Sequence, residues 1–330
     1  MLHYREELAK PIALHIFVTL VPVALISWLV LSLAGIQDIL IILLFTIILT
    51  VITLGVGVIM GLRLVLGLFH IRWVNKDNDV ILWSLVNGES AKAEVTVDGV
   101  GIIELDTPNA FVAADIQGKP VLLYTRGLLY HLTYNELRAV TTYLLGSSKS
   151  GLLPHATILS GLQSIGTRLA SGYIEGRVKK RSSNILRTIL GGWGYLYFST
   201  LNHQTTSVGK DVVHFSELYS LENASTAEYL LTALVKISYL LGIEDESYMR
   251  TGAIGLKALM FQDPSLSLRD RVKLRELVAI QNLQLDKLMG NISVGPASPS
   301  EDNLHMFEKY WVHSGLEERI GKIIEAKEKT

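Results

Sequence analysis

The sequence predicts a mostly helical α+β protein in which an amino-terminal transmembrane helical hairpin precedes a domain with a small β-sheet. Two long apolar stretches come first, and short alternating segments with turn residues follow them. Most of the remaining chain carries apolar residues at helical spacing. Apolar residues make up 49% of the 330 residues, which is high enough that we expect part of the chain to meet lipid.

The net charge and the lack of cysteine limit the kinds of function that we expect of this protein. The formal net charge of −1 leaves no basic excess to meet phosphates, which argues against a nucleic-acid-binding protein. The chain has no cysteine, so it forms no disulfide, holds no cysteine-ligated zinc and has no thiol nucleophile.

The membrane hairpin is predicted from Pro11–Ala34 and Ile39–Leu62, each long enough to cross about 30 Å of hydrocarbon. The linker Gly35–Asp38 contains no Lys or Arg, whereas cations flank the outer ends, so the positive-inside rule places both ends in the cytoplasm. These cations are Arg5, Lys10, Arg63, Arg72 and Lys76. We therefore expect an integral, multi-pass protein of the plasma membrane whose main domain and both termini are cytoplasmic.

After the hairpin the pattern changes to that of short strands. Val80–Val86 and Ala93–Leu105 contain alternating stretches, with turn signals at Asn87-Gly88 and Asp98-Gly99. Val121–Thr125 is a compact apolar run that predicts a further strand. Together these segments predict a small sheet built from strands and hairpins.

One buried helix, predicted over Asn135–Gly151, is central to the domain. Its apolar residues lie mostly on one face, Asn135 is the expected cap, and Gly146 with the following serines supplies a stop signal. A His-Glu-x-x-His metallopeptidase carries its motif on such a helix, because that spacing puts two imidazoles on one face around a zinc. Here the helix is present and the ligands are absent.

Two blocks of sequence resemble the HtpX-type membrane zinc metallopeptidases. Leu105–Val140, LDTPNAFVAADIQGKPVLLYTRGLLYHLTYNELRAV, is similar to the family's edge strand, its strand ending in Thr-x-Gly-Leu-Leu, and the start of its active-site helix. His313–Ile320 resembles the family's His-Pro-Pro-x-Glu-Glu-Arg-Ile. The resemblance implies a gluzincin-like peptidase domain behind the hairpin.

The family's zinc motif falls on residues that cannot perform its chemistry. The resemblance places Tyr143 and Ser147 on the two histidine ligands and Leu144 on the general base. A catalytic zinc needs three protein ligands, an open water position and a carboxylate to take the water's proton. We therefore expect a pseudoprotease with no catalytic residues and no cofactor.

An alternative zinc site is left open. In the family a third ligand comes from a later helix, and an ungapped match places Phe215 on that ligand and Glu217 on the neighbouring aspartate. The pair His214 and Glu217 shares a helical face and is the alternative metal site, with His155 or His203 as a further ligand.

A basic cluster suggests contact with an anionic membrane surface. The cluster lies between two moderately apolar helical segments, Leu152–Ser171 and Asn184–Leu201, and a solvated loop explains it equally well. Its cations are Arg177, Lys179, Lys180 and Arg181.

The chain divides into four parts. Residues 1–74 form the transmembrane hairpin and its flanks, and 75–292 the peptidase-like cytosolic domain, within which 152–201 is a candidate for membrane association. Residues 293–303 are a linker, and 304–330 a carboxy-terminal helical segment expected to pack on the domain.

The leading hypothesis is a membrane-anchored, catalytically inactive HtpX-like protein that binds polypeptide segments or partner proteins in membrane-protein quality control. The expected binding residues are the edge strand's Pro108, Asn109, Ala110 and Phe111, since strand addition needs no metal. The alternatives are an active metalloendopeptidase with relocated zinc ligands, and a structural subunit of a homo- or hetero-oligomeric membrane complex with Trp193–Phe198 as an interface.

Overall fold

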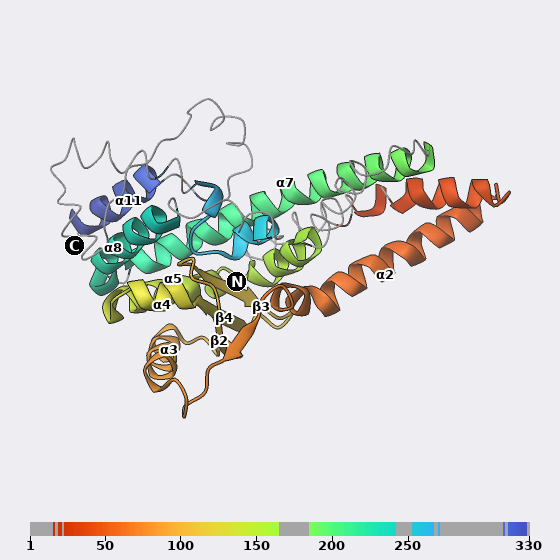
Figure 1. Cartoon of the computed structure of the whole chain (residues 1–330). Coiled ribbons are helices and arrows are strands. Elements are labelled where there is room, and N and C mark those ends of the chain that lie inside the picture. Colours follow the sequence, from red (N-terminus) through yellow and green to blue (C-terminus); the bar gives the residue numbers. More distant parts are fainter. Residues whose placement is uncertain are drawn as a thin grey trace.

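The structure is a computed structural model that describes residues 16, 19–21, 23–164, 185–222, 224–241, 253–266, 270, 313 and 316–328. It is mostly helical with one small mixed sheet, which confirms the predicted fold class at that level. Figure 1 shows the sheet and the helices around it gathered at one end, from which α2 (Ile39–Leu66) and α7 (Ile185–Glu222) extend as an arm. These elements do not confirm that the apolar helices form a transmembrane hairpin, nor that the domain is gluzincin-like.

Helix α2 is the one helix, among the described residues, that is long and apolar enough to cross a membrane. Its 28 residues rise about 42 Å at 1.5 Å per residue. Large apolar side chains are exposed along most of it, from Ile39 at 75% to Met60 at 40%. The helix begins at Asp38, whose carboxylate accepts a hydrogen bond from the Leu40 amide at 2.9 Å. This surface is typical of a helix that contacts lipid rather than a protein core.

The other predicted span, Pro11–Ala34, lies partly outside the described residues. The described part is the shorter apolar helix Thr19–Leu33, which a turn at Gly35 joins to α2. Membrane association therefore rests on one helix by length and composition, and the multi-pass arrangement expected from the sequence is not supported.

Glycines bring α2 close to the helical segment 153–164. Side-chain carbons of Leu162 and Ile158 lie 3.2 and 3.4 Å from the place of a Cβ at Gly57. A Cβ on Gly161 would lie 2.8 Å from the carbonyl oxygen of Gly61. Contact through small residues lets two helix backbones approach closely. This packing is expected in lipid, where burying apolar side chains contributes little to the association of two helices.

The sheet has four strands in the order β1-β2-β4-β3. β1 (Ile71–Trp73) pairs antiparallel with β2 (Gly99–Ile103), β2 pairs parallel with β4 (Pro120–Thr125), and β3 (Ala110–Ala114) pairs antiparallel with β4. Every residue of β3 and β4 is buried, in keeping with their continuous apolar sequence. The strand predicted over Val121–Thr125 is confirmed as β4.

The strand predicted over Val80–Val86 is wrong, because this segment begins helix α3 (Val80–Ala93). Its buried residues Leu82, Leu85, Val86 and Glu89 recur at three- and four-residue spacing and pack on α5. The Asn87-Gly88 pair, expected to form a turn, lies on the exposed side of that helix.

The central buried helix is confirmed as α5 (Tyr134–Lys149), but Asn135 is not its cap. Thr133 caps it in a reciprocal capping box: its side chain accepts from the Glu136 amide, and Glu136 accepts from the Thr133 amide at 2.8 Å. Glu136 also forms a buried ion pair with Lys236 at 2.8 Å. Burial alone would raise the pKa of Glu136, but the bonds from Lys236 and Thr133 outweigh it and hold the pKa below its ordinary value.

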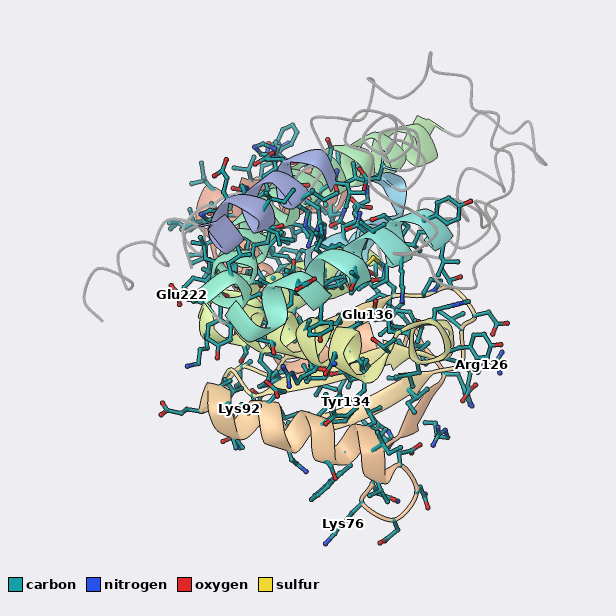
Figure 2. All side chains as sticks on the ribbon, turned by 90° about the vertical axis from the view of Figure 1, so that its left-hand side faces the viewer. Lys76, Lys92, Arg126, Tyr134, Glu136 and Glu222 are labelled. Carbon is teal, nitrogen blue, oxygen red and sulfur yellow. The ribbon has the colours of Figure 1, made fainter. Side chains whose placement is uncertain are left out.

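Helix α5 packs on the sheet, α3 and α8 pack on α5, and α11 packs on α8. Figure 2 shows α11 (Leu316–Glu328), α8 (Ala224–Leu241), α5 and α3 one above another, with Glu136 between α5 and α8. The helical segment expected over Asn184–Leu201 belongs, from Ile185 on, to the 38-residue helix α7, which also carries Phe215 and Glu217. The linker 293–303 and the cations Arg177, Lys179, Lys180 and Arg181 lie outside the described residues.

We expect Gly61→Ala to destabilise the protein and Gly55→Ala to leave it unchanged or slightly more stable. A Cβ at Gly61 would lie 3.0 Å from both the Cα and the Cγ1 of Ile158, whereas a Cβ at Gly55 meets nothing within 4 Å. Overpacking against a backbone costs about 1–3 kcal/mol. Thermal unfolding in mild detergent measures both variants, and equal midpoints would contradict the close contact between α2 and residues 153–164.

Candidate functional site

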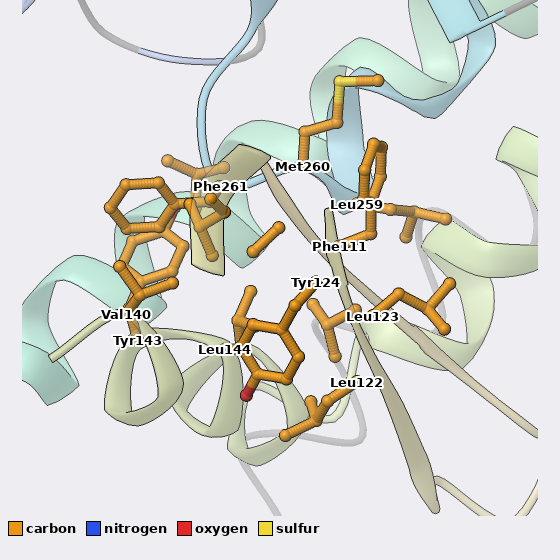
Figure 3. Packing of buried hydrophobic residues seen from close by; sticks show 14 of the residues in the cluster. Phe111, Leu122, Leu123, Tyr124, Val140, Tyr143, Leu144, Leu259, Met260 and Phe261 are labelled. Carbon is orange, nitrogen blue, oxygen red and sulfur yellow. The ribbon is translucent and has the colours of Figure 1, made fainter. Parts of the chain in front are cut away.

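The candidate site lies where α5 packs between the sheet and helices α7 and α8. The resemblance assigns zinc chemistry to Tyr143, Leu144 and Ser147 on this helix. All three are buried, with exposed fractions of 1%, 0% and 2%. Figure 3 shows Tyr143 beside Phe261 and Leu144 close to Tyr124 of β4. The position of the expected general base is therefore part of the apolar core.

Tyr143 is held by a cation and a ring. Its ring meets that of Phe261 edge-on at a centroid distance of 4.9 Å, and the Arg319 guanidinium lies 5.6 Å from its centroid. Burial raises the pKa of Tyr143 above its ordinary value, although Arg319 acts in the opposite direction. The phenol is thus uncharged at neutral pH, and its hydroxyl has no hydrogen-bond partner among the described residues. Such a group packs well and is a poor metal ligand.

Ser147 joins α5 to α7. Its hydroxyl lies 2.6 Å from that of Ser216, and both are buried. Gly146, next to it, makes the close approach possible, since a Cβ there would lie 3.0 Å from the Cβ of Tyr219 and 3.2 Å from the Cα of Ser216. At this point the two helices are joined by a hydroxyl pair.

A buried ion pair joins the carboxy-terminal helix to α7. Nε of Arg319 lies 2.6 Å from Oε1 of Glu217, and Lys322 lies 3.8 Å from the other carboxylate oxygen. Arg319 is 1% exposed, and its Nη1 donates to the side chain of Gln262. The same guanidinium lies 5.6 Å from the ring centroid of Phe261.

The residues of the alternative metal site do not come together. Within the described part of the chain, no group of three His, Cys, Asp or Glu residues is placed to hold a metal ion. Glu217 faces Arg319 and Lys322, while His214 and His203 are exposed on α7. Phe215 and His155 are half-buried.

The expected binding edge is already occupied by the chain itself. Pro108, Asn109, Ala110 and Phe111 are all buried. Residues Met260–Gln262, which we call the strap, run antiparallel along β3: Met260 bridges Phe111, and the Phe261 amide donates to the Ala110 carbonyl at 2.8 Å. Further along, the Ala114 amide donates to the Thr157 hydroxyl at 3.0 Å.

Asn109 binds the backbone of the strap. Its Nδ2 donates to the Gln262 carbonyl at 2.8 Å, and its Oδ1 accepts from the Gln262 amide at 3.3 Å. Thr125 fixes the Asn109 backbone, because its hydroxyl accepts from the Asn109 amide at 2.8 Å and its amide donates to the Asn109 carbonyl. Asn109 therefore contacts groups that every non-proline residue carries, so these contacts do not depend on the strap's sequence.

The side chain of Gln262 is also held. Its Nε2 donates to Asp270 at 2.8 Å, and the other oxygen of Asp270 accepts from the Leu316 amide at 3.2 Å. His313 lies 3.1 Å from the Lys257 carbonyl through Nε2. Burial, reinforced by the positive Arg319, lowers the pKa of His313 to about 4.

The sequence points to His313–Ile320 only through the family resemblance and gives no sign of the contact between Arg319 and Gln262. Gln262 lies 153 residues from Asn109 and 57 from Arg319, so no local pattern could reveal either contact. No protein-family model, curated protein or solved structure matches this chain. The resemblance to HtpX-type peptidases therefore rests on the two sequence blocks alone.

We expect Arg319→Met to cost about 3–5 kcal/mol of stability, because it leaves the Glu217 carboxylate buried without its closest partner. Adding Glu217→Leu should recover at least half of that loss, since no buried charge is then unpaired. Lys322→Met, which removes a half-exposed charge, is the control and should cost less than about 1 kcal/mol. Chemical denaturation measures all variants, and a double variant no more stable than Arg319→Met would contradict the ion pair's role.

We expect His313 to make the protein less stable as the pH falls. The folded state keeps His313 neutral down to about pH 4, whereas an unfolded histidine takes up a proton near pH 6.5. The unfolded chain therefore binds more protons between these values, and about 2 kcal/mol is lost between pH 7.5 and pH 5. His313→Gln should lose less stability over that range in thermal unfolding, while the exposed-site control His203→Gln should behave like the original protein.

Proposed function

We propose that this protein is a membrane-anchored, catalytically inactive relative of the HtpX-type peptidases that binds extended polypeptide segments along β3. The observation that carries the proposal is the antiparallel seating of the strap on this strand. In this contact the strand backbone and the Asn109 side chain bond the backbone of an antiparallel segment, which supports strand addition at this edge. Membrane-protein quality control is the setting that we propose for this activity.

The proposed absence of catalysis is supported by the residues at the positions that hold the zinc ligands and the base in the family. Peptide hydrolysis by zinc requires a bound water and a carboxylate that removes its proton. Leu144 has no group that can act as a base, and Tyr143 and Ser147 point into contacts with Phe261, Arg319 and Ser216. The active-enzyme alternative would need these contacts to break before a metal could be held.

The position of β3 supports substrates that come from the membrane. Helix α2 contacts β3, and Phe69, which follows α2, lies 5.0 Å from Phe111 ring to ring. The exposed apolar surface of α2 extends to Met60, so the edge lies close to the point where the proposed anchor leaves the bilayer. An unfolded segment that emerges from the membrane beside α2 would therefore lie near this edge.

We expect Phe261→Pro to open the edge to added peptide. Proline removes the amide that donates to Ala110, whereas the control Phe261→Leu keeps this donor and an apolar side chain. A fluorescent peptide copying Leu256–Pro264 should bind Phe261→Pro in detergent at least tenfold more tightly than Phe261→Leu or the unchanged protein, by anisotropy. The reason is that the strap competes in cis at an effective concentration of order millimolar.

A matched peptide tests the mode of binding. Methylation of the amide nitrogen at the Phe261 position removes one hydrogen bond and should weaken binding about 2- to 10-fold. Equal binding of both peptides, or no binding to folded Phe261→Pro, would refute strand addition. Stoichiometric zinc together with casein cleavage by the unchanged protein would refute the inactive assignment.

A further inference from the structure

We infer that the carboxy-terminal helix α11 is a latch that keeps the strap on β3, and that loosening the contact between Arg319 and Gln262 opens the edge to polypeptide. This inference rests on the proposed binding function of the edge. It adds regulation to that site, because the edge would be covered by the strap in one state and open to polypeptide in the other.

The strap's backbone contacts with the edge are few. The described contacts are the Phe261 amide on Ala110 and the two bonds between Asn109 and the backbone of Gln262. They cover one bridge of the sheet rather than a full strand. A longer extended segment would make more hydrogen bonds and could easily replace the strap, unless other contacts stabilise the strap on the edge.

The supporting contacts come from one short stretch of the carboxy-terminal block. Arg319 donates to the Gln262 side chain and approaches the Phe261 carbonyl at 3.5 Å, with its guanidinium near the ring of Phe261. The Leu316 amide donates to Asp270, which itself accepts from Gln262. His313 contacts the Lys257 carbonyl just before the strap. Arg319 thus holds the strap directly, Leu316 holds it through Asp270, and His313 holds the residue Lys257 that precedes it.

The latch is itself fastened to the body of the protein. Glu217 on α7 pairs with Arg319, and α11 packs on α8. Arg319 therefore joins the strap to α7 and adds a bond from α11 to those that Asn109 and Asp270 make with Gln262. Lys322 pairs with Glu217 and Glu318 and has no described contact with the strap. A Lys322 variant is therefore the control that weakens the ion pairs of α11 without removing a contact to the strap.

The test uses the full chain in detergent with the labelled peptide Leu256–Pro264. Arg319→Gln should raise peptide affinity at least tenfold, and Lys322→Gln should leave it within twofold of the unchanged protein. Combining Arg319→Gln with Phe261→Pro should add less than twofold to Phe261→Pro alone, because both act on the same strap. Hydrogen exchange should show faster exchange at 259–262 in Arg319→Gln, with β4 unchanged.

The outcomes separate the latch from the binding function. If Phe261→Pro binds the peptide and folded Arg319→Gln does not, the latch is wrong and the binding function stands. If neither folded variant binds, both proposals fail. Should Arg319→Gln not fold, Gln262→Met removes the amide that Arg319 and Asp270 hold while leaving α11 unchanged. This variant should gain the same tenfold, and no gain would overturn the latch.

Discussion

The arrangement of the carboxy-terminal half depends on one buried cation, the guanidinium of Arg319. A charge with 1% exposure is stable only when it is paired and hydrogen-bonded. Its partners come from three segments that are distant in sequence: the ring of Tyr143 on α5, the carboxylate of Glu217 on α7, and the strap, while Arg319 itself lies on α11. Removing any one of them leaves the charge less well compensated, so these segments stay together as a unit.

Under the proposed relationship to HtpX-type peptidases, this unit replaces the cohesion that a zinc would supply. A metal joins helices through ligand bonds to a central positive charge. Here α5 and α7 meet through a glycine crossing and the hydroxyl pair of Ser147 and Ser216, while the positive charge comes from a side chain. The helix frame can therefore persist without its ligands, because the same helices are fastened by packing and an ion pair.

Sequence patterns correctly predicted the elements that depend on residues close together in the chain. The apolar length of α2, the compact strand β4 and the central helix α5 are of this kind. Thr133 and Glu136 form a Thr-x-x-Glu capping signal that was present in the sequence and overlooked in favour of Asn135. The start of α3 reads equally as strand or helix, and packing on α5 decides it. The strap could not be predicted, since its partners lie 57 and 153 residues away.

A covered edge is compatible with a binding role because of how the cover is built. An open, fully apolar edge beside a membrane would pair with other chains and aggregate, so it needs protection. The strap protects the Ala110 end through one bridge, and Thr157 bonds the Ala114 amide at the other end. A short peptide gains too few bonds to displace a tethered competitor, whereas a longer extended segment can replace the strap and pair with more of the strand. Under the proposed function, this geometry would favour long unfolded segments over short peptides.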